Sequence, residues 1–110
     1  MIFDELVRQL QAIQGVSFAE YEWKTRPAGN FGTVQLDFEA EDDDGDDCKI
    51  DTAWEGSVDL FTIGKQMEIV SAVESALTSV CESSWYLNSE QYERETGLIH
   101  REYVFQIESR

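Results

Sequence analysis

The acidic residues between Asp37 and Asp47 are the group whose spacing most directly suggests a chemical role. Eight of these eleven residues are Asp or Glu. A calcium loop of the EF-hand type would place Gly45 at its sixth position. The same register puts Ala40 at the first ligand position and Asp51, not Glu, at the twelfth. Strands, not helices, are also predicted on both sides, so no metal site is predicted here.

The acidic run lies between two predicted strands, which places it at the tip of a hairpin. Two interpretations stay open: the tip contributes only solubility, or it docks on a basic partner. Aromatic side chains on strands that must partly face away from the helices also suggest a protein interface; they are Tyr21, Trp23, Tyr86 and Tyr92. The candidate partner-binding residues are Glu41, Asp42, Asp43, Asp44, Asp46, Asp47 and Trp23.

The residues that usually carry catalysis do not form a recognisable group. His100 is the only histidine, so no Ser-His-Asp or Cys-His arrangement has support, and an exposed structural role is expected for it. Cys48 and Cys81 lie 33 positions apart without metal-ligand spacing and are interpreted as reduced thiols. Glycine-rich phosphate loops are absent from the sequence. We therefore predict no catalytic residue, no cofactor and no enzymatic activity.

Length and net charge exclude further classes of function. The 110 residues suit one domain, assigned as 1–110, and a hydrophobic fraction of 42% argues against disorder. A net charge of −15 opposes binding to nucleic acid and to anionic membranes, since both attract basic proteins. No apolar run is long enough to span a bilayer, and the acidic start Met1–Glu5 does not resemble a signal peptide. A cytoplasmic site of folding is expected.

Hydrophobic periodicity predicts seven elements. Helices are expected over 2–14 and 64–81, where apolar residues recur at helical spacing. Strands are expected over 16–23, 33–40, 50–60, 85–92 and 99–107, with a turn around Glu95-Thr96-Gly97. The order is α-β-β-β-α-β-β. The predicted fold class is α+β, with two layers: an antiparallel sheet of about five strands and two helices on one face.

The register of the first predicted hairpin follows from matching its apolar faces. A three-residue loop, Asp43-Asp44-Gly45, sets Phe38 opposite Ile50 and Val34 opposite Trp54. The predicted core contains Leu6, Leu10, Leu36, Phe38, Trp54, Val58, Leu60, Val73, Leu77 and Phe105.

Two stretches resemble a known family. The first stretch is Gly56–Thr62, which precedes the second predicted helix. The opening helix, with Asp4–Val7, fits the same family. The other comprises Ser84–Ser89, Tyr92-Glu93, Thr96–His100 and Tyr103–Phe105. These residues resemble small tail-terminator, or tail-completion, proteins of long-tailed phages and prophages of Gram-positive bacteria.

The resemblance implies a structural function without catalytic residues. Such proteins close the tail tube as a ring, typically a hexamer, and contact the major tail tube protein and the head-tail connector proteins. They assemble in the cytoplasm of the bacterial host and become part of the virion tail. The alternative function from another class is an acidic DNA mimic that inhibits a host nucleic-acid-binding protein. The concentration of acids in one hairpin favours local docking over such mimicry.

Overall fold

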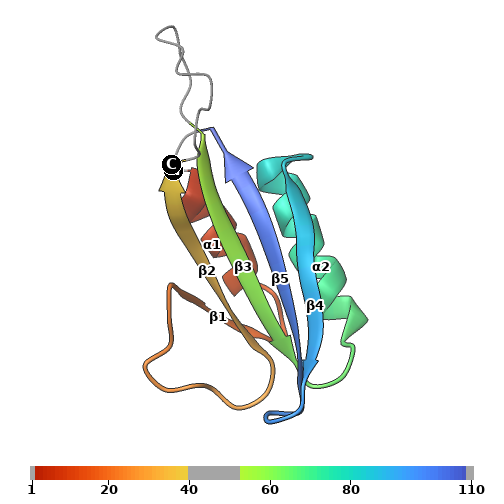
Figure 1. The fold of residues 1–110 in the computed structure, drawn as a ribbon. Coiled ribbons are helices and arrows are strands. Elements are labelled where there is room, and N and C mark those ends of the chain that lie inside the picture. The colour runs from red at the N-terminus through yellow and green to blue at the C-terminus, as the bar shows by residue number, and fades with distance from the viewer. Residues whose placement is uncertain (1, 40–52, 109–110) are drawn as a thin grey trace, which may run out of the picture.

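The computed structural model describes residues 2–39 and 53–108 of the chain (Figure 1). The acidic residues Glu41 to Asp47 and the predicted loop Asp43-Asp44-Gly45 lie outside these described residues. The elements are α1 (Ile2–Gln11), β1 (Ser17–Glu20), β2 (Phe31–Glu39), β3 (Trp54–Thr62), α2 (Met67–Cys81), β4 (Trp85–Glu93) and β5 (Leu98–Ile107).

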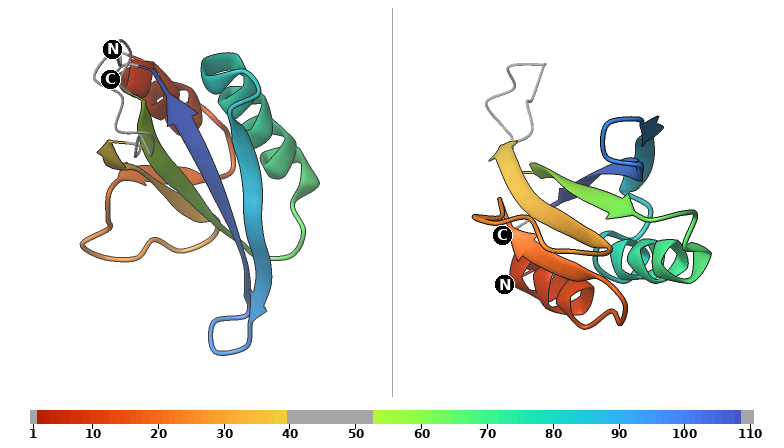
Figure 2. Two further views of the ribbon diagram at one scale, coloured as in Figure 1. Left: turned by 45° about the horizontal axis from the view of Figure 1, so that its top comes forward. Right: turned by 90° about the horizontal axis from the view of Figure 1, so that it is seen from below.

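The five strands form one sheet in the order β1-β2-β3-β5-β4, and both helices cover the same face of it (Figure 2). The predicted α+β class and element order are confirmed. The wholly antiparallel sheet needs one correction, because β1 pairs parallel to β2, with Ser17 opposite Phe31. The loop between these strands returns the chain to the end where β1 began. Alternation along a strand is the same in both directions, so the sequence pattern could not reveal this.

The core lies between the helices and the covered face of the sheet. On α1, Phe3, Leu6, Val7 and Leu10 are buried, which is the stripe that a 3.6-residue period produces. From the predicted core, Leu6, Leu10, Val58, Leu60, Val73, Leu77 and Phe105 are buried, while Leu36 and Trp54 are partly buried against them. The Phe38 side chain lies outside the described part.

Both helices are shorter than predicted, for local reasons. The first ends at Gln11, before Gly15, whose φ is +87°. The second begins at Met67, because Gly64 and Gln66 adopt left-handed backbone conformations with φ values of +77° and +47°. The predicted first strand also ends early, at Glu20, since Tyr21 has a φ of +73°. The apolar patterns in the sequence therefore extend past the ends of these helices and this strand into the adjoining turns.

The predicted register of the β2–β3 hairpin is wrong by four residues at Val34 and by five at Phe38. Val34 lies opposite Val58, not Trp54, and Phe38 lies opposite Glu55, not Ile50. A shift by an even number keeps every side chain on its face, so alternation does not distinguish the two registers. An irregularity between Leu36 and Phe38 shifts the pairing further.

The C-terminal hairpin closely matches the prediction. Strands β4 and β5 pair antiparallel around a turn in which the Gly97 amide donates to the Glu93 carbonyl at 2.8 Å. The φ of Gly97 is +75°, a conformation in which glycine has no side chain to clash. This hairpin makes β4 an edge strand of the sheet.

Candidate interaction surfaces

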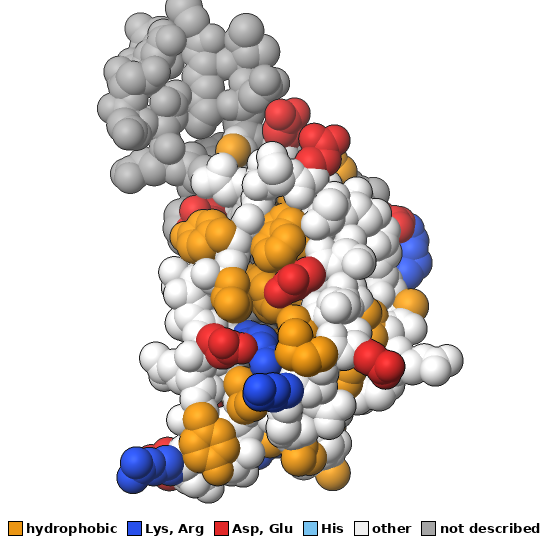
Figure 3. Space-filling view, turned by 90° about the vertical axis from the view of Figure 1, so that its right-hand side faces the viewer, with side chains coloured by type: hydrophobic (Ala, Val, Ile, Leu, Met, Phe, Trp, Pro, Cys, Tyr) orange, Lys and Arg blue, Asp and Glu red, His pale blue; other side chains and the backbone are white. Residues whose placement is uncertain are grey.

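The β4 edge carries a row of exposed apolar side chains. Tyr86, Leu87 and Tyr92 are 56%, 42% and 65% exposed. Figure 3 views this side of the molecule, where hydrophobic patches alternate with acidic and basic side chains beside α2. Large apolar side chains on an edge strand favour protein contacts, because the strand can pair with another chain.

The backbone of β4 supports the same conclusion. The Gln106 amide donates to the Ser84 carbonyl at 2.9 Å, which makes this facing pair a hydrogen-bonded one. Bonded and non-bonded pairs alternate along an antiparallel ladder. The backbone groups of Trp85 and Leu87 are therefore directed away from β5, toward the free edge.

Polar contacts behind the edge hold β4 and β5 against each other and against α2. The Arg101 side chain is 4% exposed; its Nε donates to Glu90 Oε2 at 2.6 Å and its Nη1 to Thr62 Oγ1 at 3.2 Å. The Tyr103 hydroxyl donates to Glu74 Oε2 on α2 at 2.7 Å. Burial, followed by this hydrogen bond, raises the pKa of Tyr103, so the hydroxyl stays a donor. The edge is thus presented by a fixed scaffold.

The open face of the sheet carries an aromatic row that crosses three strands. Phe31, Phe61 and His100 are successive cross-strand neighbours on β2, β3 and β5. Their rings stack with centroid distances of 4.8 Å and 4.2 Å. Arg26 adds a cation–π contact, with its guanidinium carbon 5.3 Å from the Phe31 centroid. The sequence prediction missed this row, because it appears only once the register is known.

His100 lies between two carboxylates on this face. Its Nε2 is 2.8 Å from Asp59 Oδ1, and its Nδ1 is 3.4 Å from Glu93 Oε2. The hydrogen bond to Asp59 raises the pKa of His100, and burial opposes this only in part. The histidine, which is partly buried and not exposed as predicted, therefore links β3 and the β4–β5 hairpin through charge.

Trp23 is the one predicted partner-binding residue that the structure describes. It lies in the loop after β1, and its indole Nε1 donates to the Gly32 carbonyl at 3.0 Å. Gly32 is at the start of β2, whereas the acidic residues follow the end of β2 at Glu39. These points are about 20 Å apart at the rise of a strand. Trp23 is therefore hydrogen-bonded near the start of β2, whereas the acidic run follows the other end of that strand in the sequence.

The described residues offer neither a metal site nor a membrane-spanning helix. Within residues 2–39 and 53–108, no group of His, Cys, Asp or Glu side chains is arranged to hold a metal ion. Of the two helices described, neither is long and apolar enough to cross a membrane.

Burial raises the pKa of the Cys81 thiol to about 11, which keeps it protonated and unreactive at neutral pH.

Comparison with known proteins gives a likeness in fold. No protein-family model matches the sequence, and no curated protein matches it. Among solved structures, the chain is similar to one from "Virion of native gene transfer agent (GTA) particle". The two share 13% sequence identity and a TM-score of 0.52, over 94% of this chain and 90% of the other. At this identity the likeness shows that both chains have the same kind of fold.

Proposed function

We propose that this chain is a structural component of a phage-like particle, and specifically a tail-terminator or tail-completion protein. The observation that carries the proposal is the fold likeness to a virion chain over nearly the full length of both chains. The sequence resemblance to tail-terminator proteins supports the same assignment from different information. In this role the protein closes the tail tube as a ring, such as a hexamer, without catalysis.

The uncovered parts of the sheet supply the contacts in this proposal. Subunits of a ring meet through heterologous surfaces, so each copy needs two different patches. The β4 edge, with Leu87 and Tyr92, offers backbone groups and apolar area for one of them. The remaining surfaces contact the major tail tube protein and the head-tail connector proteins, with the acidic residues 41–47 docking on a basic partner.

Deletion of the gene from a strain that produces the particle tests this function. Electron microscopy of the lysate is expected to show tails of irregular length that are not joined to heads. Expression of the full chain from a plasmid should restore joined particles. Particles of normal length and joining in the deletion strain would contradict the proposal. A pull-down from host lysate that recovers nucleases would instead favour the acidic DNA mimic.

Self-association should depend on salt. With −15 charges on each copy, repulsion opposes ring closure, so the free protein is expected to be a monomer or a weak oligomer at low ionic strength. Added salt screens this repulsion and should favour rings. Light scattering across a salt series measures the effect. A tight ring at low salt that dissociates when salt is added would contradict this expectation.

A further inference from the structure

The two edges of the sheet differ in whether their outward backbone groups are already bonded. On β1, the Tyr21 amide that follows the strand donates to β2, so alternation directs the carbonyls of Phe18 and Glu20 away from β2. The Phe18 carbonyl accepts from the Gln11 side chain at 3.4 Å, and the Glu20 carbonyl accepts from the Glu22 amide at 3.0 Å. The outward carbonyls of β1 are therefore occupied within the chain.

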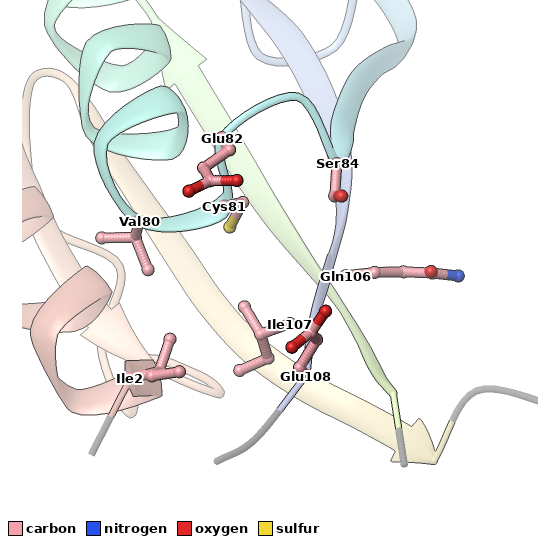
Figure 4. A pocket seen from close by; sticks show the side chains of 8 residues that line it. All are labelled: Ile2, Val80, Cys81, Glu82, Ser84, Gln106, Ile107 and Glu108. Carbon is pink, nitrogen blue, oxygen red and sulfur yellow. The ribbon is translucent and has the colours of Figure 1, made fainter. Parts of the chain in front are cut away.

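The outward backbone groups of β4, in contrast, have no hydrogen-bond partner among the described residues. The bonded pair of Ser84 and Gln106 lies side by side at one end of the β4–β5 pairing (Figure 4). Alternation along the antiparallel ladder then directs the N–H and C=O groups of Trp85 and Leu87 to the free edge. An open edge of this kind can accept another strand.

A register shift in β4 gives Leu87 and Tyr92 an orientation that a regular strand would not allow. Residues five apart on a regular strand point to opposite faces. Here Asn88 is the extra residue, so Leu87 lies opposite Tyr103 and Tyr92 lies opposite Ile99. These two β5 residues are four apart and share the helix-covered face. Leu87 and Tyr92 therefore both lie on this face, both direct their backbone groups outward, and both side chains are exposed.

We propose that the β4 edge of the free protein pairs antiparallel with the β4 edge of a second copy. In a two-fold dimer each contact occurs twice, and facing residues of a joined sheet must lie on the same face. Leu87 opposite Tyr92 of the second copy meets both conditions, once on each side of the axis. Each such pair brings an aliphatic side chain against an aromatic ring and joins free backbone groups.

The charges along β4 favour this register over its neighbour. It sets Glu90 opposite Ser89, and Glu93 opposite Tyr86, of the second copy, so carboxylates do not face each other. A slip by two residues would instead set Leu87 opposite Glu90. The net charge of −15 still opposes association, so the dimer needs salt to screen the repulsion. The dimer covers the edge that the proposed ring uses, and it is therefore a form of the free chain before assembly.

Sedimentation of the purified full chain tests whether the edge forms the dimer. As salt rises to about 0.5 M, where the Debye length is about 4 Å, the parent should form dimers before any larger oligomer. Leu87→Lys with Tyr92→Lys should stay monomeric, and Tyr21→Lys with Ile63→Lys, exposed elsewhere, should dimerise like the parent. A monomeric parent, a direct change from monomer to ring, or dimers of the edge variant would overturn the proposal. Because purified chain is used, failure of the particle assignment leaves this result intact.

Disulfide formation between two variants tests the register. Chains with Leu87→Cys and chains with Tyr92→Cys, both carrying Cys48→Ser, are mixed at the same salt and oxidised. Cys81 is kept, since its buried thiol stays protonated. The mixture should form linked dimers at least about tenfold faster than either variant alone, because two copies of residue 87 lie about 15 Å apart, beyond the reach of a disulfide. Equal rates in the mixture and in the single variants, or no linked dimer in the mixture, would overturn the proposed pairing.

Discussion

The two faces of the sheet use polar residues in opposite ways. On the face beneath the helices, Arg101, Thr62 and Tyr103 are almost fully buried, and each has a hydrogen-bond partner. On the open face, the carboxylates of Asp59, Glu93 and Glu102 stay partly exposed around the single histidine. The first arrangement satisfies polar groups within the chain, while the second leaves them accessible to another molecule.

This difference assigns separate tasks to the two sides. Burial of apolar area under α1 and α2 supplies the stability of the fold. The open face and the β4 edge contribute less to stability but display charge, aromatic rings and free backbone groups. Substitutions on the covered face should therefore lower stability, and substitutions on the uncovered parts should affect binding.

The largest expected loss of stability comes from placing a charge on the covered side of the sheet. Val73 on α2 is completely buried, so Val73→Asp places an unpaired carboxylate in the core. We expect the free energy of unfolding to fall by more than about 4 kcal/mol. Thermal denaturation followed by circular dichroism measures this, with the exposed Ser75→Asp of the same helix as control. An unchanged midpoint for Val73→Asp would refute the placement of α2.

A smaller loss is expected at Gly56 on β3, where the neighbouring strands β2 and β5 of the same sheet leave no room for a side chain. A methyl group at Gly56 would contact the backbone oxygen of Gln35 and the ring of Phe105 inside van der Waals distance. Gly56→Ala should therefore cost about 1–3 kcal/mol. Gly29→Ala, where nothing lies within 4 Å, tests backbone strain alone and should cost less. Urea unfolding measures the loss of stability in both variants. A larger loss for Gly29→Ala than for Gly56→Ala would contradict the close packing around Gly56.

The open face should contribute a small, pH-dependent stabilisation through His100. Because its pKa is raised in the folded state, this contribution is complete below the ordinary value near 6.5. It is lost as the pH rises through the folded pKa. We expect about 0.5 kcal/mol for such a partly exposed charge network. Urea unfolding of parent and His100→Gln between pH 6 and 9 measures it. Equal pH dependence in both proteins would contradict the charge network.

The smallest effect on stability is expected from the acidic run. Replacing Asp42, Asp43, Asp44, Asp46 and Asp47 with Asn should leave stability unchanged or slightly higher, since close carboxylates repel by about 0.5–1 kcal/mol per pair. If these residues dock on a basic partner, association should slow and its salt dependence should flatten. Association rates with the tail at two ionic strengths test this. Equal association rates of the parent and the variant at low salt would contradict docking and leave the acidic run with a role in solubility only.

The sequence predicted those features that depend on local periodicity. Helix α2 and the β4–β5 hairpin were placed to within a few residues, because stripes and alternation reflect burial on one side. The four-residue register error at Val34 and the parallel pairing of β1 concern relations between distant segments. Alternation has the same appearance in either register and in either strand direction.

The candidate site was only partly predictable for the same reason. The exposed aromatics of β4 were identified, but the row of Phe31, Phe61 and His100 depends on the register of three strands. The buried Arg101 gave no local signal, since charged residues are normally exposed and its partner Glu90 lies on another strand.

The most direct test of the account concerns the β4 edge, where stability and assembly should separate. The variant Leu87→Lys with Tyr92→Lys removes two exposed apolar side chains and protects the edge with charge. The control, Tyr21→Lys with Ile63→Lys, changes equally exposed residues elsewhere. Each is expressed in the deletion strain, and the chain in purified particles is quantified by mass spectrometry. We expect the edge variant to keep the parent thermal midpoint and to be incorporated at least about tenfold less than the control, a loss equivalent to about 1.4 kcal/mol. Equal incorporation of both variants would contradict the claim that the uncovered edge is the assembly surface.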